Sequence, residues 1–165
     1  ARAVQFPNCP GETALVLRGP QGTGKGTVAH IFGALFGRHY AHVTHARHFV
    51  GNFNAHLRDC VVLFADEAFF AGDKQHESAL KTLITEPTMQ IELKGVDAEQ
   101  MPNYIHLIMS SNKDWVVPAG PLERRFVVLD VADNEQQNED YFAAIRAQMK
   151  AGGMGALLYE LSNLD

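Results

Sequence analysis

The sequence of 165 residues predicts an α/β fold in which a central, mostly parallel β-sheet is flanked by helices. Four short apolar runs, rich in β-branched or aromatic residues, recur along the chain, and segments with apolar residues at helical spacing separate them. Because most of these runs lack polar alternation, we expect strands that are buried on both faces, as in a parallel sheet. Ligands of such sheets bind at the carboxyl ends of the strands.

The elements follow in order from these patterns. The apolar runs predict strands at Ala14–Arg18, Cys60–Ala65, Ile105–Ser110 and Phe126–Val131. Apolar spacing predicts helices at Lys25–Phe36, at His76–Ile84 before Pro87, at Tyr141–Lys150, and after a Gly-Gly break around Leu157, Leu158 and Leu161. The segment Thr88–Asn103 interrupts this rhythm with alternation, a turn glycine and Pro102, and predicts a β-hairpin that projects from the sheet.

Size and composition limit the class of protein. With 46% hydrophobic and 20% charged residues, the chain suits one folded domain over residues 1–165, and its Ala-Arg-Ala start suggests a domain of a longer polypeptide. No apolar run approaches the length that crosses a bilayer, so we expect no membrane association. Cys9 and Cys60 have no pairing pattern, which favours a reducing intracellular compartment such as the cytoplasm. The net charge of −5 excludes nucleic-acid binding by bulk attraction.

The stretch "GPQGTGKGT" follows the first expected strand and opens the first expected helix. Backbone N–H groups of such a loop can surround phosphate oxygens, and its lysine reaches the β- and γ-phosphates. The residues expected to bind nucleotide are Gly19, Pro20, Gln21, Gly22, Thr23, Gly24, Lys25, Gly26 and Thr27. Gly26 stands where the motif has a hydroxyl, and Thr27 follows one place later. Thr27 can contact Mg²⁺, contact a phosphate or cap the helix, and the sequence leaves these roles open.

Polar residues end the next two strands. Asp66 and Glu67 follow the second strand, where one carboxylate can hold Mg²⁺ and the other can orient a water that attacks the γ-phosphate. Asn112 follows the third strand and can hydrogen-bond the water and the phosphate. Arg124 and Arg125 precede the fourth strand, and arginine suits a transferring phosphoryl group, often on a neighbouring subunit. Taken alone, Asn112 is more simply a turn residue, and the arginines are more simply surface residues.

Together these motifs resemble a superfamily 3 helicase of the AAA+ class, in particular the helicase-type domain of phage and plasmid primase-helicases. The resemblance covers Thr13 to about Leu161 and includes the stretches "GNFNAHL", "DEAFFAGDKQHESALKTLITEP", "IELKGVD" and "SSNKDWVVPAGPLERRFVVLDV". It implies a P-loop NTPase fold and a DNA-translocating ATPase that uses ATP and Mg²⁺. It also implies a ring, typically a hexamer, fused to or associated with a primase or polymerase. The cell implied by the resemblance is a bacterial or phage-infected one, with the protein in its cytoplasm.

The resemblance implies a role for each site residue. Lys25 becomes the phosphate lysine, Asp66 and Glu67 the metal and catalytic acids, and Asn112 the sensor. Arg125 becomes the arginine finger, with Arg124 as the other candidate. Such domains commonly carry "GKG", so Gly26 does not remove the activity. The hairpin would line a channel for DNA, with Lys94 as its one cation among acidic residues, and a solvated lysine at a turn is the alternative.

Two other classes of function stay open. The second class is a nucleoside or nucleotide kinase, because the loop "GTGKGT" resembles that of adenylate kinases. Such kinases need an acceptor pocket and an arginine-rich lid, and arginines are few here. A non-hydrolysing ATP-binding assembly module is the third class. His39, His42, His45 and His48 recur every third residue, which invites a zinc site. Residues spaced strictly by three do not stay on one face of a helix, and no Cys or acidic residue lies between these histidines. We therefore expect a polar surface run or a loop near the nucleotide.

Overall fold

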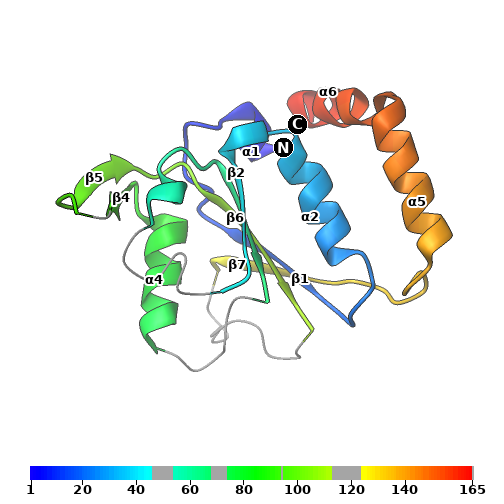
Figure 1. Cartoon of the computed structure of the whole chain (residues 1–165), viewed down its shortest axis with the longest axis horizontal. Helices are drawn as coiled ribbons and strands as arrows, with labels where there is room; N and C mark the ends of the chain where they lie inside the picture. Colours follow the sequence, from blue (N-terminus) through cyan, green and yellow to red (C-terminus); the bar gives the residue numbers. More distant parts are fainter. Residues whose placement is uncertain (46–53, 68–73, 94, 113–123, 165) are drawn as a thin grey trace.

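A five-stranded parallel sheet with the strand order β2-β3-β6-β1-β7 forms the centre of the protein (Figure 1). The computed structural model describes residues 1–45, 54–67, 74–93, 95–112 and 124–164, with the backbone alone at 74–77. The strands of this sheet are β1 (Ala14–Arg18), β2 (Tyr40–Val43), β3 (Val62–Asp66), β6 (His106–Ser111) and β7 (Phe126–Asp130). The predicted α/β fold with a mostly parallel sheet is confirmed.

Helices cover both faces of the sheet. On one face, α1 (Arg2–Gln5) and α2 (Lys25–Ala34) pack their apolar residues on Leu17, Phe64 and Ile108. On the other face, α4 (Lys74–Thr85) packs on Val16, Leu63 and Met109. Neighbouring residues such as Leu63 and Phe64 therefore belong to separate cores, both fully buried. This two-sided burial explains why β1, β3 and β6 read as continuous apolar runs.

Two strands differ from the prediction. The apolar sequence of β7 predicts burial on both faces, but among the described strands β7 pairs only with β1, and Val127, Val128 and Leu129 are 40–49% exposed. It is an edge strand. β2 escapes prediction, because its sequence "YAHV" carries polar residues and follows the short 3-10 turn η1 (Gly37–His39). β2 is the opposite edge strand, so one of its faces can stay polar.

The predicted hairpin is present and consists of β4 (Thr88–Ile91) and antiparallel β5 (Glu99–Pro102), placed between α4 and the amino end of β6. A second 3-10 turn, η2 (Ala55–Leu57), follows Asn54, whose side chain bonds the backbone of Gln90 and Glu92. At the base of the hairpin, Asn103 is 1% exposed and donates to the carbonyls of Leu83 and Glu86, both at 2.8 Å. Lys94, the expected DNA-binding residue, lies outside the described residues.

The chain ends in two helices, α5 (Glu139–Gln148) and α6 (Met154–Asn163), joined by the irregular turn η3 (Met149–Gly153). Gly152 has φ +106° there, which confirms the predicted break at the Gly-Gly pair. Gln5 of α1 donates to the carbonyls of Leu161 and Leu164 at 3.0 and 2.7 Å. The two ends of the chain therefore lie side by side (Figure 1).

Among the described helices, none combines the length and the apolar character that crossing a membrane would require.

Candidate active site

The glycine-rich loop joins the carboxyl end of β1 to the amino end of α2 and borders a cavity of about 430 Å³. Such a volume suits a small ligand. Gly22 and Gly24 have φ of +83° and +90°, conformations that side chains other than glycine rarely adopt. The described residues that line the cavity are Gln21, Gly22, Gly24, Lys25, Gly26, Thr27, Asp66, Glu67, Asn112, Gln137, Glu139, Phe142 and Arg146.

Lys25 lies inside the loop and is only 7% exposed. Its ammonium donates to the carbonyls of Gly19 at 2.7 Å and Pro20 at 2.6 Å, and to Oδ1 of Asn112 at 3.0 Å. Burial lowers the pKa of Lys25, whereas the charges of Glu67 and Asp66 raise it. Thr23 is also buried, and its hydroxyl donates to the carbonyl of Pro20 at 3.0 Å. A cation is thus held at the centre of a loop that can bind an anion.

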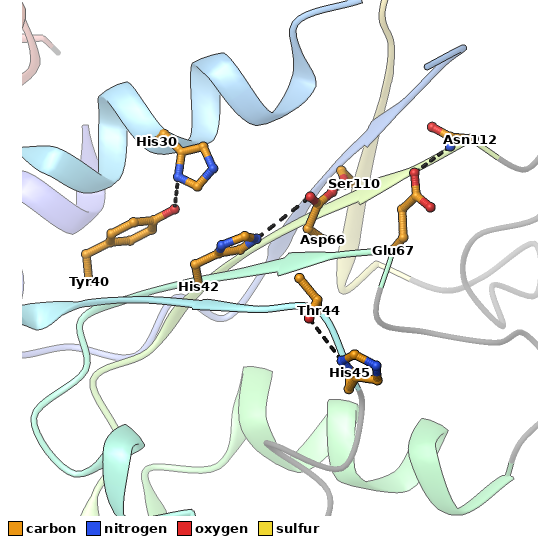
Figure 2. Close-up of polar contacts among 9 residues, drawn as sticks. All are labelled: His30, Tyr40, His42, Thr44, His45, Asp66, Glu67, Ser110 and Asn112. Atoms are coloured by element: carbon orange, nitrogen blue, oxygen red, sulfur yellow. Dashed lines mark hydrogen bonds and ion pairs between the residues drawn. The ribbon is translucent and has the colours of Figure 1, made fainter. Parts of the chain in front are cut away.

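Asp66 ends β3, and both of its carboxylate oxygens have a neighbour (Figure 2). Oδ1 accepts a hydrogen bond from the hydroxyl of Ser110. Oδ2 lies 3.7 Å from Nε2 of His42, a distance longer than a hydrogen bond. Carboxylate and hydroxyl oxygens are the ligands that Mg²⁺ prefers, and Asp66 and Thr27 both line the cavity, so the donor set fits this ion.

Glu67 has φ +51°, which is uncommon for a residue other than glycine. Its N–H donates to the carbonyl of Ser110 at 3.2 Å, and its carboxylate accepts a hydrogen bond from Nδ2 of Asn112 (Figure 2). A sharp change of direction therefore follows Asp66, and the two neighbouring carboxylates bond different residues. Two acids on one strand end can accordingly perform different tasks.

Sequence reasoning named His42 without pairing it with Asp66, and it missed His30 and Tyr40. The His42 ring stacks on Phe64 at a centroid distance of 5.0 Å, and the edge of His30 meets it at 4.9 Å. Nδ1 of His30 is 2.9 Å from the hydroxyl of Tyr40 (Figure 2). Burial, followed by the charge of Asp66, raises the pKa of Tyr40 to about 12, and burial lowers the pKa of His30. The period of two in "YAHV", which puts Tyr40 and His42 on one face of β2, was the available signal.

The histidines at positions 39, 42 and 45 have separate partners. Nδ1 of His39 is 2.7 Å from the carbonyl of Asp59, and Nδ1 of His45 is 3.0 Å from the hydroxyl of Thr44. His42 faces Asp66, and His48 lies outside the described residues. Within the part of the chain that the structure describes, no three His, Cys, Asp or Glu side chains form a group that could hold a metal ion.

The segment after β7 forms a wall of the cavity that the sequence did not reveal. The side chain of Gln136 donates to the carbonyl of Gln21 at 2.7 Å, and the backbone N–H of Gln137 donates to the carbonyl of Gly22 at 3.0 Å. Phe142 and Arg146 of α5 line the cavity. Nothing in the pattern of this helix marks it as a ligand wall, because its role depends on a tertiary contact with a loop more than a hundred residues earlier.

Arg124 and Arg125 lie elsewhere and are not among the described residues that line the cavity. They precede β7, and Arg125 lies beside Ala14 at the amino end of β1, where its carbonyl accepts from the N–H of Ala14 at 2.7 Å. Together with Glu12, Thr13 and Thr85 they line a separate hollow of about 350 Å³. The glycine-rich loop begins at the opposite end of β1. The structure therefore joins Lys25, Asp66, Glu67 and Asn112 but leaves both arginines apart from them.

Comparisons with known proteins agree with this fold. Residues 17–125 match the model of a family described as "family of unknown function (DUF5906)". The chain is 27% identical over 120 residues to a DNA primase-polymerase of Nitratiruptor phage NrS-1, a match that covers 71% of this chain and 17% of that protein. The chain thus spans less than a fifth of the length of this relative.

Solved structures of the NrS-1 C-terminal region resemble the whole chain. An apo structure of that region has a TM-score of 0.82 and 22% identity, and the match covers 99% of this chain and 40% of that one. A second one, described as an A-form apo structure, has a TM-score of 0.81 and 21% identity over 99% of this chain and 39% of its own. At this level of identity the likeness shows a shared fold.

Proposed function

We propose that this chain, which belongs to the DUF5906 family, binds ATP with Mg²⁺ and hydrolyses it as the motor domain of a DNA-replication protein of primase-polymerase type. One observation carries the proposal: a buried lysine, two carboxylates and an amide, from the loop and two strand ends, border one cavity. The likeness to a phage DNA primase-polymerase supports the replication context. Helicase or translocase activity is the form of motor that the sequence resemblance implies.

In this proposal each side chain has one task. The N–H groups of Gly22–Thr27 and the ammonium of Lys25 bind the β- and γ-phosphates. Asp66 and Thr27 would hold the ion, which neutralises phosphate charge when bound. Glu67 orients a water and accepts its proton as the water oxygen bonds to the γ-phosphorus. The bond from that phosphorus to the bridging oxygen breaks, and ADP and phosphate form. Asn112 donates to the γ-phosphate or the water.

The arginine finger is proposed to come from another subunit. Arg124 and Arg125 lie at the amino end of β7, away from the cavity of their own chain. A ring of subunits, with six as the expected number, would bring this end of one chain to the cavity of the next. Arg125 is the first candidate and Arg124 the second. The hairpin with Lys94 is proposed to face single-stranded DNA in the channel of the ring.

The test is steady-state ATP hydrolysis with Mg²⁺ across protein concentration, with and without single-stranded DNA. We expect turnover per subunit to rise with concentration and with DNA, and to disappear in Glu67→Gln. Arg125→Ala should abolish turnover and leave ATP affinity intact, whereas Lys25→Ala should lose ATP binding. Turnover that ignores concentration and needs a nucleoside acceptor would replace the motor by a kinase. ATP binding without hydrolysis under all conditions would favour an assembly module.

A further inference from the structure

The ammonium of Lys25 has no donor to spare for a ligand. An ammonium group has three N–H bonds. Three protein oxygens lie within hydrogen-bond distance of it: the carbonyls of Gly19 and Pro20, and Oδ1 of Asn112. Because the side chain is 7% exposed, water has little access to it. If Lys25 is to bind a phosphate, one of these three acceptors has to be exchanged for a phosphate oxygen.

Asn112 is the acceptor that can leave. The two carbonyls belong to a backbone that is itself fixed, because Gly19 donates its N–H to the carbonyl of Ser111 at 3.1 Å and Thr23 donates to Pro20. Asn112 is an exposed side chain, and its contact with Lys25 is the longest of the three, at 3.0 Å against 2.6 and 2.7 Å. Its amide can turn away without moving the loop.

The other end of the same amide holds Glu67. With Oδ1 facing a cation, Nδ2 faces the carboxylate of Glu67 and donates to it. The backbone of Glu67 is fixed at φ +51° by the bond from its N–H to Ser110, so its carboxylate is directed at Asn112. A negative charge on one side of an amide strengthens the bond that its oxygen accepts on the other side. Lys25, Asn112 and Glu67 therefore form one chain of hydrogen bonds.

We propose that Asn112 competes with the nucleotide for Lys25 and keeps Glu67 occupied until a γ-phosphate takes its place. Binding of the triphosphate exchanges Oδ1 of Asn112 for a phosphate oxygen on Lys25. The bond between Asn112 and Glu67 weakens as a result, and Glu67 becomes available to a water. This inference rests on the proposed function, since it requires ATP in the cavity. It makes Asn112 a positioning residue whose release is coupled to binding.

The two possible roles of Asn112 predict opposite signs. If Asn112 only donates to the phosphate, its removal weakens ATP binding. If Asn112 competes for Lys25, its removal frees one N–H donor of the ammonium for a phosphate oxygen, and ATP binds more tightly. We expect Asn112→Ala to lower the Kd for ATP about five-fold, the scale of the net contribution of one ordinary hydrogen bond. ADP lacks the γ-phosphate, so Asn112→Ala should increase the affinity for ADP less than the affinity for ATP.

Calorimetric titration with ATP in EDTA measures this affinity without hydrolysis. Asn163→Ala, at the exposed end of α6, is the matched control and should bind ATP like the wild type. Asn112→Ser, whose hydroxyl is too short to reach Lys25, should also bind ATP more tightly. Equal or weaker binding in both Asn112 variants, with wild-type melting temperatures, would overturn the inference and leave the proposed function standing. A wild-type chain that binds ATP neither in EDTA nor with Mg²⁺ would overturn both.

A double-mutant cycle tests the link to Glu67. Glu67→Gln should also tighten ATP binding, because the neutral amide supports Asn112 less than a carboxylate does. If Glu67 acts through Asn112, this gain should disappear in the Asn112→Ala background. If the increases in ATP affinity from the two substitutions multiply, Glu67 acts on the phosphates by its own charge. The proposed action of Glu67 through Asn112 would then be wrong.

Discussion

Phe142 lies so close to Gly24 that a Cβ atom at position 24 would be 2.5 Å from Cε1 of its ring. The aromatic ring of Phe142, which belongs to α5, thus packs on the backbone of the loop at the amino end of α2. Glycine is favoured at this position for two reasons: its φ of +90° suits glycine, and the ring of Phe142 leaves no space for a Cβ atom. This contact joins the first helix after β1 to the helix after the last strand of the sheet.

Gly24→Ala should therefore destabilise the fold by more than the conformational cost alone, which is about 1–2 kcal/mol for a left-handed residue. Gly37→Ala is the control, because Gly37 has φ +52° and a methyl group at this position would meet no atom within 4 Å. Denaturant unfolding should give a larger loss for Gly24→Ala, and Phe142→Ala in that background should recover part of it. Equal losses at the two positions would show that the ring contact is unimportant.

Asn103→Ala should be strongly destabilising. The amide donates to two carbonyls at the end of α4, and its oxygen accepts from the N–H of Ile105 at 3.0 Å. Removing a 1% exposed side chain leaves these groups without a partner, at a cost of about 3 kcal/mol. Asn54→Ala, which removes two bonds at a more accessible site, should cost about 1 kcal/mol by the same reasoning. Urea unfolding compares them, and a smaller cost at Asn103 would contradict the account.

His106 should make stability depend on pH. Burial, followed by the charge of Arg2, lowers its pKa from 6.5 to about 4. Between these two values the unfolded chain binds a proton that the folded chain does not, so the free energy of unfolding falls as the pH falls from 6.5 to 4. Above pH 6.5 the effect is absent. Unfolding measured at pH 7 and pH 5 should show a larger loss for the wild type than for His106→Gln. An equal loss of unfolding free energy in the wild type and in His106→Gln would show that His106 is not the cause of the pH dependence.

The two cysteines should differ in reactivity. Cys60 is 3% exposed, and burial raises the pKa of its thiol to about 12, whereas Cys9 is half-buried. Because the thiolate is the nucleophile, a thiol reagent at pH 8 should modify one cysteine in the native protein and two in denaturant. Cys9→Ser should leave the native protein unreactive. Rapid modification of Cys60 in that variant would mean that the segment leading into β3 opens readily.

The sequence predicted those parts of the fold that depend on local pattern. The apolar runs of β1, β3 and β6 and the glycine-rich loop are legible because two-sided burial and left-handed glycines restrict residue type. Asp66, Glu67 and Asn112 were found because they end those strands. The two edge strands were harder to predict from the sequence. β7 is apolar like a central strand, although its residues are partly exposed. β2 carries the polar His42, which its position at the edge of the sheet tolerates.

The remaining part of the site depends on contacts that no local pattern encodes. Gln136, Gln137 and Phe142 meet the loop only because the chain returns from β7 across the end of β1. The link from Lys25 through Asn112 to Glu67 likewise depends on the register of β6 between β1 and β3. The roles proposed for Arg124, Arg125 and Lys94 remain predictions.

The strand order also bears on how the chain acquires its shape. β1 lies between β6 and β7, and its last residue, Arg18, bonds Asp130, 112 positions later, at 2.5 and 2.8 Å. During synthesis β1 therefore emerges long before either neighbour exists, and the loop that follows it has no wall to rest on. Closing such long loops is slow compared with forming local contacts. The cavity beside the glycine-rich loop is thus among the last parts of the molecule to form, and a nascent chain that stops short of β7 would expose β1 as a bare apolar edge.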